Sequence, residues 1–190
     1  MRKAGMFMNL RKLLRLSILT LLIGIAGLGL YLWQLQRSGN FHSVVAGELY
    51  RSNQPTPERL VLYQKEEHIR SILNLRGAHP GAPWYEAERK AAEQLGLTLV
   101  DFPMSDHEVL SPARVDALTR TLAEAPKPLL VHCKAGADRS GLASALYLAR
   151  IAHVDPEIAE QQLSIFYGHF SVPWLSRAWP MDVTWQAAER

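Results

Sequence analysis

PLLVHCKAGADRSGLASALYLA, residues 128–149, contains the single cysteine of this 190-residue chain. Two apolar runs flank the cysteine: residues 128–131 are typical of a short buried strand, and residues 142–149 of a helix. The ten residues between them, 132–141, predict a tight loop with a glycine in it, followed by the opening of the helix. Cys133 lies at the start of this loop, and Arg139 follows six positions later.

The loop has the composition of an anion-binding site with a nucleophile in it. A thiol becomes a good nucleophile at neutral pH when converging backbone N–H groups, a helix N-terminus or an arginine favours the thiolate. Residues 134–139 are expected to form a ring of N–H groups, with Gly136 permitting the curvature. Arg139 offers a planar pair of donors for two phosphate oxygens. These features predict a cysteinyl-phosphate intermediate, with Ser140 hydrogen-bonded to the sulfur as it departs.

The sequence predicts a membrane segment followed by one α/β domain. Residues 16–36 carry no charge, and their 21 residues compare with about 20 needed to span a bilayer. A buried core helix and a cleaved signal peptide are the alternatives, but the run is long for both and no small-x-small site follows it. The expected organisation is a basic segment (1–15), a transmembrane helix (16–36), a linker (37–40), a catalytic domain (41–170) and a Trp- and Pro-rich C-terminal extension (171–190).

Charge supports this division. Residues 1–37 contain six basic and no acidic side chains, so residues 38–190 hold fifteen basic and eighteen acidic ones. The basic character belongs to the N-terminal segment and gives no argument for nucleic-acid binding. The positive-inside rule predicts a cytoplasmic N-terminus and an extracytoplasmic, in bacteria periplasmic, domain. A lone cysteine excludes an internal disulfide and a cysteine-based metal site, and no cofactor is expected.

Strand and helix patterns alternate along the domain, which predicts a central sheet flanked by helices. Strands are expected within residues 41–50, at 69–75, 97–102 and 129–132. Helices are expected at 57–67, 84–95, 113–125, 140–152 and 157–167. The tryptophans of the last 20 residues are expected to pack on the domain as a short helix or coil, or to form a membrane-facing aromatic patch.

The loop resembles the signature of the cysteine-dependent protein tyrosine phosphatases, His-Cys-x5-Arg-Ser-Gly, and is similar to its small dual-specificity-like group. Two further segments resemble this family: Tyr-Arg-Ser-Asn-Gln-Pro at 50–55 and Ile-Leu-Asn-Leu-Arg at 72–76. The resemblance implies a phosphomonoester hydrolase with Cys133 as nucleophile and Arg139 as phosphate clamp. The phosphate-binding set it implies is Lys134, Ala135, Gly136, Ala137, Asp138 and Arg139, with the Asp138 side chain outside the ring.

The family also implies a general acid, an aspartate about thirty residues before the cysteine. Asp106, in the loop after a predicted strand, is the preferred candidate, since residues 104–108 resemble the family's Trp-Pro-Asp-His-Gly loop. Asp101, within the strand, and Glu108 are the alternatives. Arg51 and Arg76 are candidates for lining the pocket or for salt bridges elsewhere.

Several functions fit these residues. The leading one is a membrane-anchored phosphomonoester hydrolase similar to protein tyrosine and dual-specificity phosphatases. The second is a phosphoinositide or other lipid-phosphate phosphatase, since the anchor would hold the domain beside such substrates. Lys134 resembles one of two loop lysines of lipid-specific relatives, but Asp138 replaces the second, which weakens this alternative. A catalytically inactive phosphate-binding module and a rhodanese-like sulfur transferase are less favoured, because nucleophile and arginine are both present at the phosphatase spacing.

Overall fold

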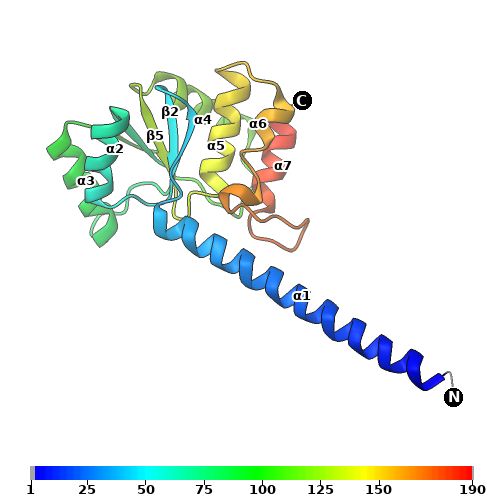
Figure 1. The fold of residues 1–190 in the computed structure, drawn as a ribbon. Coiled ribbons are helices and arrows are strands. Elements are labelled where there is room, and N and C mark those ends of the chain that lie inside the picture. Colours follow the sequence, from blue (N-terminus) through cyan, green and yellow to red (C-terminus); the bar gives the residue numbers. More distant parts are fainter. Residues whose placement is uncertain (1–2, 190) are drawn as a thin grey trace. The chain divides into compact units, whose positions relative to one another are not determined.

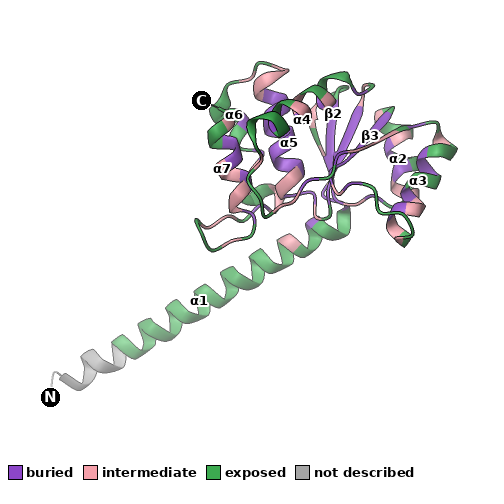
Figure 2. Cartoon of the chain, turned by 180° about the vertical axis from the view of Figure 1, so that it is seen from behind, coloured by how far each residue is buried: buried purple, intermediate pink, exposed green. Residues whose placement is uncertain are grey.

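The computed structural model describes residues 3–189, with side chains from residue 10 onward. The chain divides into two compact units, Met1–Arg37 and Ser38–Arg190. The described residues of the first unit form one helix, α1 (Lys3–Ser38), whose last residue belongs to the second unit. Its residues Leu10–Ser38 are long and apolar enough to cross a membrane, by length and composition, and they are exposed along nearly their whole length (Figure 2).

Helix α1 is longer than the predicted span of residues 16–36 and absorbs half of the predicted linker. No proline occurs before Gly39, whose φ of 98° lies in the left-handed region. Asn40 follows with a φ of 46°. The connection to the domain is therefore only two residues long, Gly39 and Asn40.

A five-stranded sheet organises the second unit (Figure 1). Its strands are β1 (His42–Val45), β2 (Leu49–Ser52), β3 (Ser71–Asn74), β4 (Thr98–Asp101) and β5 (Leu129–His132). The strand order is β1-β2-β5-β3-β4. Strand β1 is antiparallel to β2, and the other pairings are parallel, so the sheet is mixed.

Helices cover both faces of this sheet (Figure 1). One face carries α2 (Pro57–Glu67) and α3 (Pro83–Leu95), and the other carries α4 (Pro112–Glu124), α5 (Asp138–Arg150), α6 (Pro156–Glu160) and α7 (Trp179–Ala188). Proline at the first helical position opens four of them, and in α2, α3 and α4 it follows a residue of extended backbone.

The core lies in two layers because successive strand residues point to opposite faces. In β5, Leu129 and Val131 pack with α4, α5 and α7, whereas Leu130 packs with α2 and α3. All four residues of β5 are buried, as expected for a central strand covered on both sides. The predicted α/β class with a central sheet flanked by helices is confirmed.

Two predicted helices differ from the structure. Helix α5 begins at Asp138 instead of residue 140, so Asp138 and Arg139 lie in its first turn. The helix predicted at 157–167 is wrong: α6 ends at Glu160, and a separate 3₁₀ turn, η1 (Ile165–Tyr167), follows. The extended backbone of Ser164 (φ −138°, ψ 162°) separates the two pieces.

The last twenty residues contribute to the core. Helix α7 buries Met181 and Trp185 in the same cluster as α5 and β5. Arg150 of α5 donates a hydrogen bond to the Ala188 carbonyl (2.9 Å), which holds the end of α7 against the domain. Residues 179–188 are therefore an integral layer of the compact unit.

Candidate active site

Strand β5 delivers Cys133 to the centre of the sheet. β5 lies between β2 and β3, and Cys133 follows its last residue with only 2% of its surface exposed. In open α/β sheets, ligands bind at the carboxyl ends of the central parallel strands. The cysteine singled out from the sequence therefore sits where this fold places a ligand.

The loop after Cys133 is held open by donors that bind its outer side. Four successive carbonyl groups accept hydrogen bonds from outside the loop: Lys134 from the Gln54 N–H (3.3 Å), Ala135 from Asn40 Nδ2 (3.0 Å), and Gly136 and Ala137 from Arg51 Nη2 (2.9 Å each). The C=O and N–H of a trans peptide point in opposite directions. The N–H groups of residues 135–138 are thereby turned away from these donors, toward the inside of the loop, as an anion requires.

Arg51 is the main brace of the loop. Its side chain is completely buried, and Nη1 donates to both the backbone and the side-chain oxygen of Gln162 (2.8 Å each). The Tyr167 ring lies 4.1 Å from its guanidinium carbon. Burial lowers the pKa of Arg51 to about 10, while Tyr167 and the nearby Cys133 and Asp138 oppose this shift. Arg51 therefore stays charged at neutral pH and supports the loop from behind instead of lining the pocket.

Gly136 allows the loop to approach β2. Its φ is 72°, and a Cβ at this position would lie 2.6 Å from the Asn53 nitrogen and 2.7 Å from the Ser52 carbonyl carbon. Both neighbours are backbone atoms, so they cannot move aside as a side chain would. Glycine is required here by conformation and by space.

Helix α5 positions the remaining loop residues. Ser140 is fully buried, and its Oγ lies 3.5 Å from Cys133 Sγ. Arg139 Nη1 donates to the Met104 carbonyl (3.2 Å), and Nη2 lies 4.0 Å from Asp106 Oδ2. The guanidinium thus connects the cysteine loop with the loop after β4.

The two candidate aspartates lie in different surroundings. Asp101 accepts hydrogen bonds from Asn74 Nδ2 (2.8 Å) and from the Tyr85 hydroxyl (2.6 Å). The bond to Asp101 is the main reason that the pKa of Tyr85 rises to about 12. Asp101 is therefore occupied in joining β3, β4 and α3.

Asp106 lies in an open cleft of about 600 Å³. The cleft is lined by Asp106, His107, Lys134, Asp138, Arg139, Gly168, Phe170, Ser176, Arg177 and Ala178. His107 Nδ1 lies 2.7 Å from Asp106 Oδ1, and the Arg177 guanidinium contacts His107 Nε2. Glu108, the third candidate, is exposed and is not among the cleft-lining residues.

Arg76 lies at the edge of the site. Its Nη1 donates to Gln54 Oε1 (2.7 Å), and its guanidinium carbon lies 3.3 Å from the centre of the Trp84 ring. Burial and the charge of Arg139 lower the pKa of Arg76. Because Gln54 also donates to Lys134, Arg76 supports the loop indirectly.

Two buried histidines near the loop have carboxylate partners that the sequence did not predict. His132 Nε2 lies 2.7 Å from Glu88 Oε1 of α3. His169 lies between two carboxylates, with Nδ1 2.7 Å from Asp138 and Nε2 3.1 Å from Asp182 of α7. Burial disfavours the charged imidazole, but the two carboxylates outweigh it and raise the pKa of His169 to about 9. Each histidine is distant in sequence from its carboxylate partners. The only signal in the sequence that could have suggested these pairs is the general preference of buried charged groups for a partner.

Comparison with known proteins agrees with this geometry. The model of a family described as "Swiss Army Knife protein, DSP-PTPase phosphatase domain" matches residues 38–189. Two curated Beta-lactamase hydrolase-like proteins of Xylella fastidiosa are 33% identical over 87 residues, which make up 45% of this chain and 20% of theirs. The chain therefore spans about a fifth of the length of these relatives.

Solved structures with a similar fold are more distant in sequence. TpbA of P. aeruginosa in complex with pTyr has a TM-score of 0.62 at 20% identity, covering 80% of this chain and 86% of TpbA. The catalytic core of the PP-IP phosphatase SIW14 of S. cerevisiae has a TM-score of 0.58 at 22% identity. The match covers 79% of this chain and 83% of the SIW14 chain. PTPMT1 in complex with PI(5)P has a TM-score of 0.58 at 16% identity, covering 78% of this chain and 96% of the PTPMT1 chain. These likenesses concern the fold.

Proposed function

The chain belongs to the DSP-PTPase phosphatase domain family and is a cysteine-dependent phosphatase, and on that premise we propose how its residues carry out the reaction. Cys133 is the nucleophile, Arg139 clamps the phosphate and Asp106 is the general acid. The N–H groups of the loop residues 134–139 bind the phosphate oxygens. The observation that carries this proposal is the set of outward-held carbonyls around Cys133, which leaves an inward-facing ring of donors above a thiol.

In the first step the Cys133 thiolate attacks the phosphorus atom of a phosphomonoester. A sulfur–phosphorus bond forms as the bond to the ester oxygen breaks, and Asp106 gives its proton to the departing oxygen. Arg139 and the loop N–H groups stabilise the negative charge on the three non-bridging oxygens.

In the second step water attacks the cysteinyl-phosphate from the side that the alcohol has left. Asp106, now a carboxylate, takes a proton from this water. The sulfur–phosphorus bond breaks, inorganic phosphate is released, and Ser140 donates a hydrogen bond to the returning thiolate. The separation of 3.5 Å between Ser140 Oγ and Cys133 Sγ supports this role.

The full chain in detergent with an aryl phosphate as substrate tests the proposal. Cys133→Ser is expected to abolish turnover, and Arg139→Lys to lower kcat/KM by about a hundredfold, the scale of losing one preorganised donor. Phosphate release by the Cys133→Ser protein at the wild-type rate would refute the proposed nucleophile.

Comparison of two variants tests the general acid. Asp106→Asn is expected to slow hydrolysis of an alkyl phosphate, whose leaving group needs a proton, far more than that of an aryl phosphate with a good leaving group. Asp101→Asn is expected to lower stability through its bonds to Asn74 and Tyr85. The reverse pattern would assign the proton transfer to Asp101.

We further propose that α1 anchors the enzyme in a membrane with the N-terminus in the cytoplasm and the catalytic domain outside it. The apolar residues Leu10–Ser38 and the excess of basic side chains before the span support this arrangement. Protease added to intact spheroplasts should digest the domain. A protected domain would reverse the topology.

A further inference from the structure

Apolar side chains are exposed in η1 and in the segment between η1 and α7. We call Ile165, Phe170, Trp174 and Leu175 the apolar rim. Trp174 and Leu175 are the most exposed, at 89% and 84% of their surface. Trp174 also has a φ of 57°, a backbone conformation that a bulky residue adopts at a cost. Exposed apolar side chains grouped along one short segment mark a candidate interaction surface.

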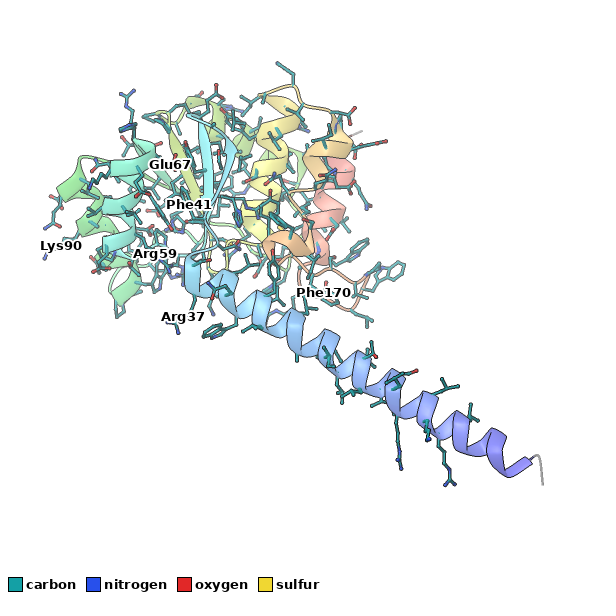
Figure 3. All side chains as sticks on the ribbon, in the orientation of Figure 1. Arg37, Phe41, Arg59, Glu67, Lys90 and Phe170 are labelled. Atoms are coloured by element: carbon teal, nitrogen blue, oxygen red, sulfur yellow. The ribbon has the colours of Figure 1, made fainter. Side chains whose placement is uncertain are left out.

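The apolar rim adjoins the active-site cleft. Phe170 lines the cleft together with Gly168, Ser176 and Arg177, which come from the same segment. Figure 3 shows Phe170 on the orange segment that follows η1. Whatever covers the rim therefore meets the opening through which a phosphorylated substrate enters.

The chain enters the domain at this same face. Asn40 is two residues past the end of α1, and its side chain donates to the Tyr167 carbonyl of η1 (2.9 Å) and to the Ala135 carbonyl of the cysteine loop (3.0 Å). The point where the chain leaves a membrane-spanning helix, the cysteine loop and the start of the rim segment are thus direct neighbours within the domain.

We propose that the apolar rim docks on the lipid bilayer that anchors the chain and turns the cleft toward phosphomonoesters held at the membrane surface. Aromatic and aliphatic side chains at this level bury themselves at the boundary between head groups and acyl chains. Lys134, Arg139 and Arg177 in the adjoining cleft suit an anionic head group. The inference rests on the proposed phosphatase function and names its substrate class.

Lipid contact is tested first without using activity. In the full-length Cys133→Ser chain, the only thiol is replaced, and Leu175→Cys then carries an environment-sensitive fluorophore. In vesicles of phosphatidylcholine and phosphatidylglycerol, lipids with a spin label high on the acyl chain are expected to quench it. Val61→Cys on α2, half exposed in the structure, is the matched control and should not be quenched.

Two results would overturn the docking. One is equal quenching, or none, at both labelled positions. The other is a label at 175 that is shielded from water but not reached by the lipid-borne quencher, which would assign the rim to a second copy of the chain or to another protein.

The substrate class is tested with Trp174→Ser/Leu175→Ser, two residues that do not line the cleft. With a phosphoinositide in vesicles, the variant is expected to lose at least about tenfold in rate, since losing the burial of either side chain alone would have an effect of that size. Its rate on a soluble aryl phosphate should equal that of the wild type and of the control Val61→Ser/Leu62→Ser. Equal rates on the vesicles would refute the inference, whereas a wild type inactive on aryl phosphate would refute the proposed function and leave the quenching result standing.

Discussion

Glu88 Oε1 lies 2.7 Å from His132 Nε2, and neither side chain is exposed to solvent. His132 is the last residue of β5 and immediately precedes Cys133, while Glu88 comes from the middle of α3. The contact therefore connects a helix on one face of the sheet with the base of the cysteine loop. Because buried carboxylates are costly without a partner, this pair is a strong constraint on the position of the loop.

Removing Glu88 should cost both stability and activity. We expect Glu88→Ala to lower the free energy of unfolding by about 3–5 kcal/mol, the penalty for leaving one member of a buried pair alone. Urea unfolding of Glu88→Ala, His132→Ala and the double variant measures the coupling: the double variant should lose less than the two single ones together. Glu93→Ala, exposed on the same helix, is the control and should change little. Strict additivity would mean that the pair does not interact.

Arg51→Lys should impair catalysis while the fold is retained. A lysine keeps the positive charge but cannot donate at the same time to Gln162, Gly136 and Ala137. We expect kcat/KM for an aryl phosphate to fall about tenfold to a hundredfold, less than the loss of a donor that contacts phosphate itself. Arg70→Lys, at an exposed position, is the control. Unchanged inhibition by phosphate in the Arg51→Lys protein would argue against a brace for the anion loop.

Gly136→Ala and Gly47→Ala separate two roles of glycine. Both residues have a left-handed φ, 72° and 76°, so both substitutions should cost about 1 kcal/mol or more in stability. Only at Gly136 would the new methyl meet backbone atoms; at Gly47 nothing lies within 4 Å. Phosphatase activity should therefore be lost in Gly136→Ala alone. Equal activities would show that the loop tolerates displacement from β2.

Stability should fall as the pH rises above neutrality, through His169. The pKa of this side chain is about 9 in the folded protein and 6.5 in the unfolded one, so its contribution is complete below pH 6.5 and is lost as the pH rises through 9. The shift corresponds to roughly 3 kcal/mol at most. Urea midpoints of the wild type at pH 6, 7.5 and 9 should decline, and those of His169→Gln should not follow this decline. The same slope in both proteins would exclude His169 as its source.

Low pH should also weaken the pairing of His169 with its carboxylates, through protonation of Asp182. Hydrogen bonding and the charge of His169 outweigh burial and lower the pKa of Asp182 below its ordinary 3.8. The stability that Asp182 contributes is present above pH 3.8 and is lost as the pH falls through its folded value. Asp182→Asn should therefore remove part of the acid-induced loss in unfolding midpoints that begins as the pH falls below 3.8.

The sequence predicted those features of the fold and the site that depend on local residue types and their spacing. Apolar runs bounded by proline and glycine predicted the five strands and most helix starts, because capping and burial act locally. The lone cysteine with Gly136 and Arg139 at fixed offsets predicted the anion loop, since a ring of donors needs those residues at that spacing.

Contacts between distant residues could not be predicted in this way. Glu88, Asn40 and His169 carry no local signal, because each acquires its role only when the fold brings a partner beside it. Arg51 belongs to a segment that resembled the family, yet its position behind the loop depends on the pairing of β2 with β5. Helix α7 was expected as an extension because tryptophan and proline spacing does not reveal what Trp185 packs against.

Because Asn40 donates a hydrogen bond to the Ala135 carbonyl, the residue at which the chain is truncated affects the cysteine loop. A recombinant fragment starting at residue 41, or a domain released by a protease that cuts there, would have a cysteine loop that lacks one of the four hydrogen bonds to its carbonyl groups. A fragment ending at residue 170 would also lose Asp182 and Trp185. Cleavage just after Asn40 should therefore lower the phosphatase activity of the released domain.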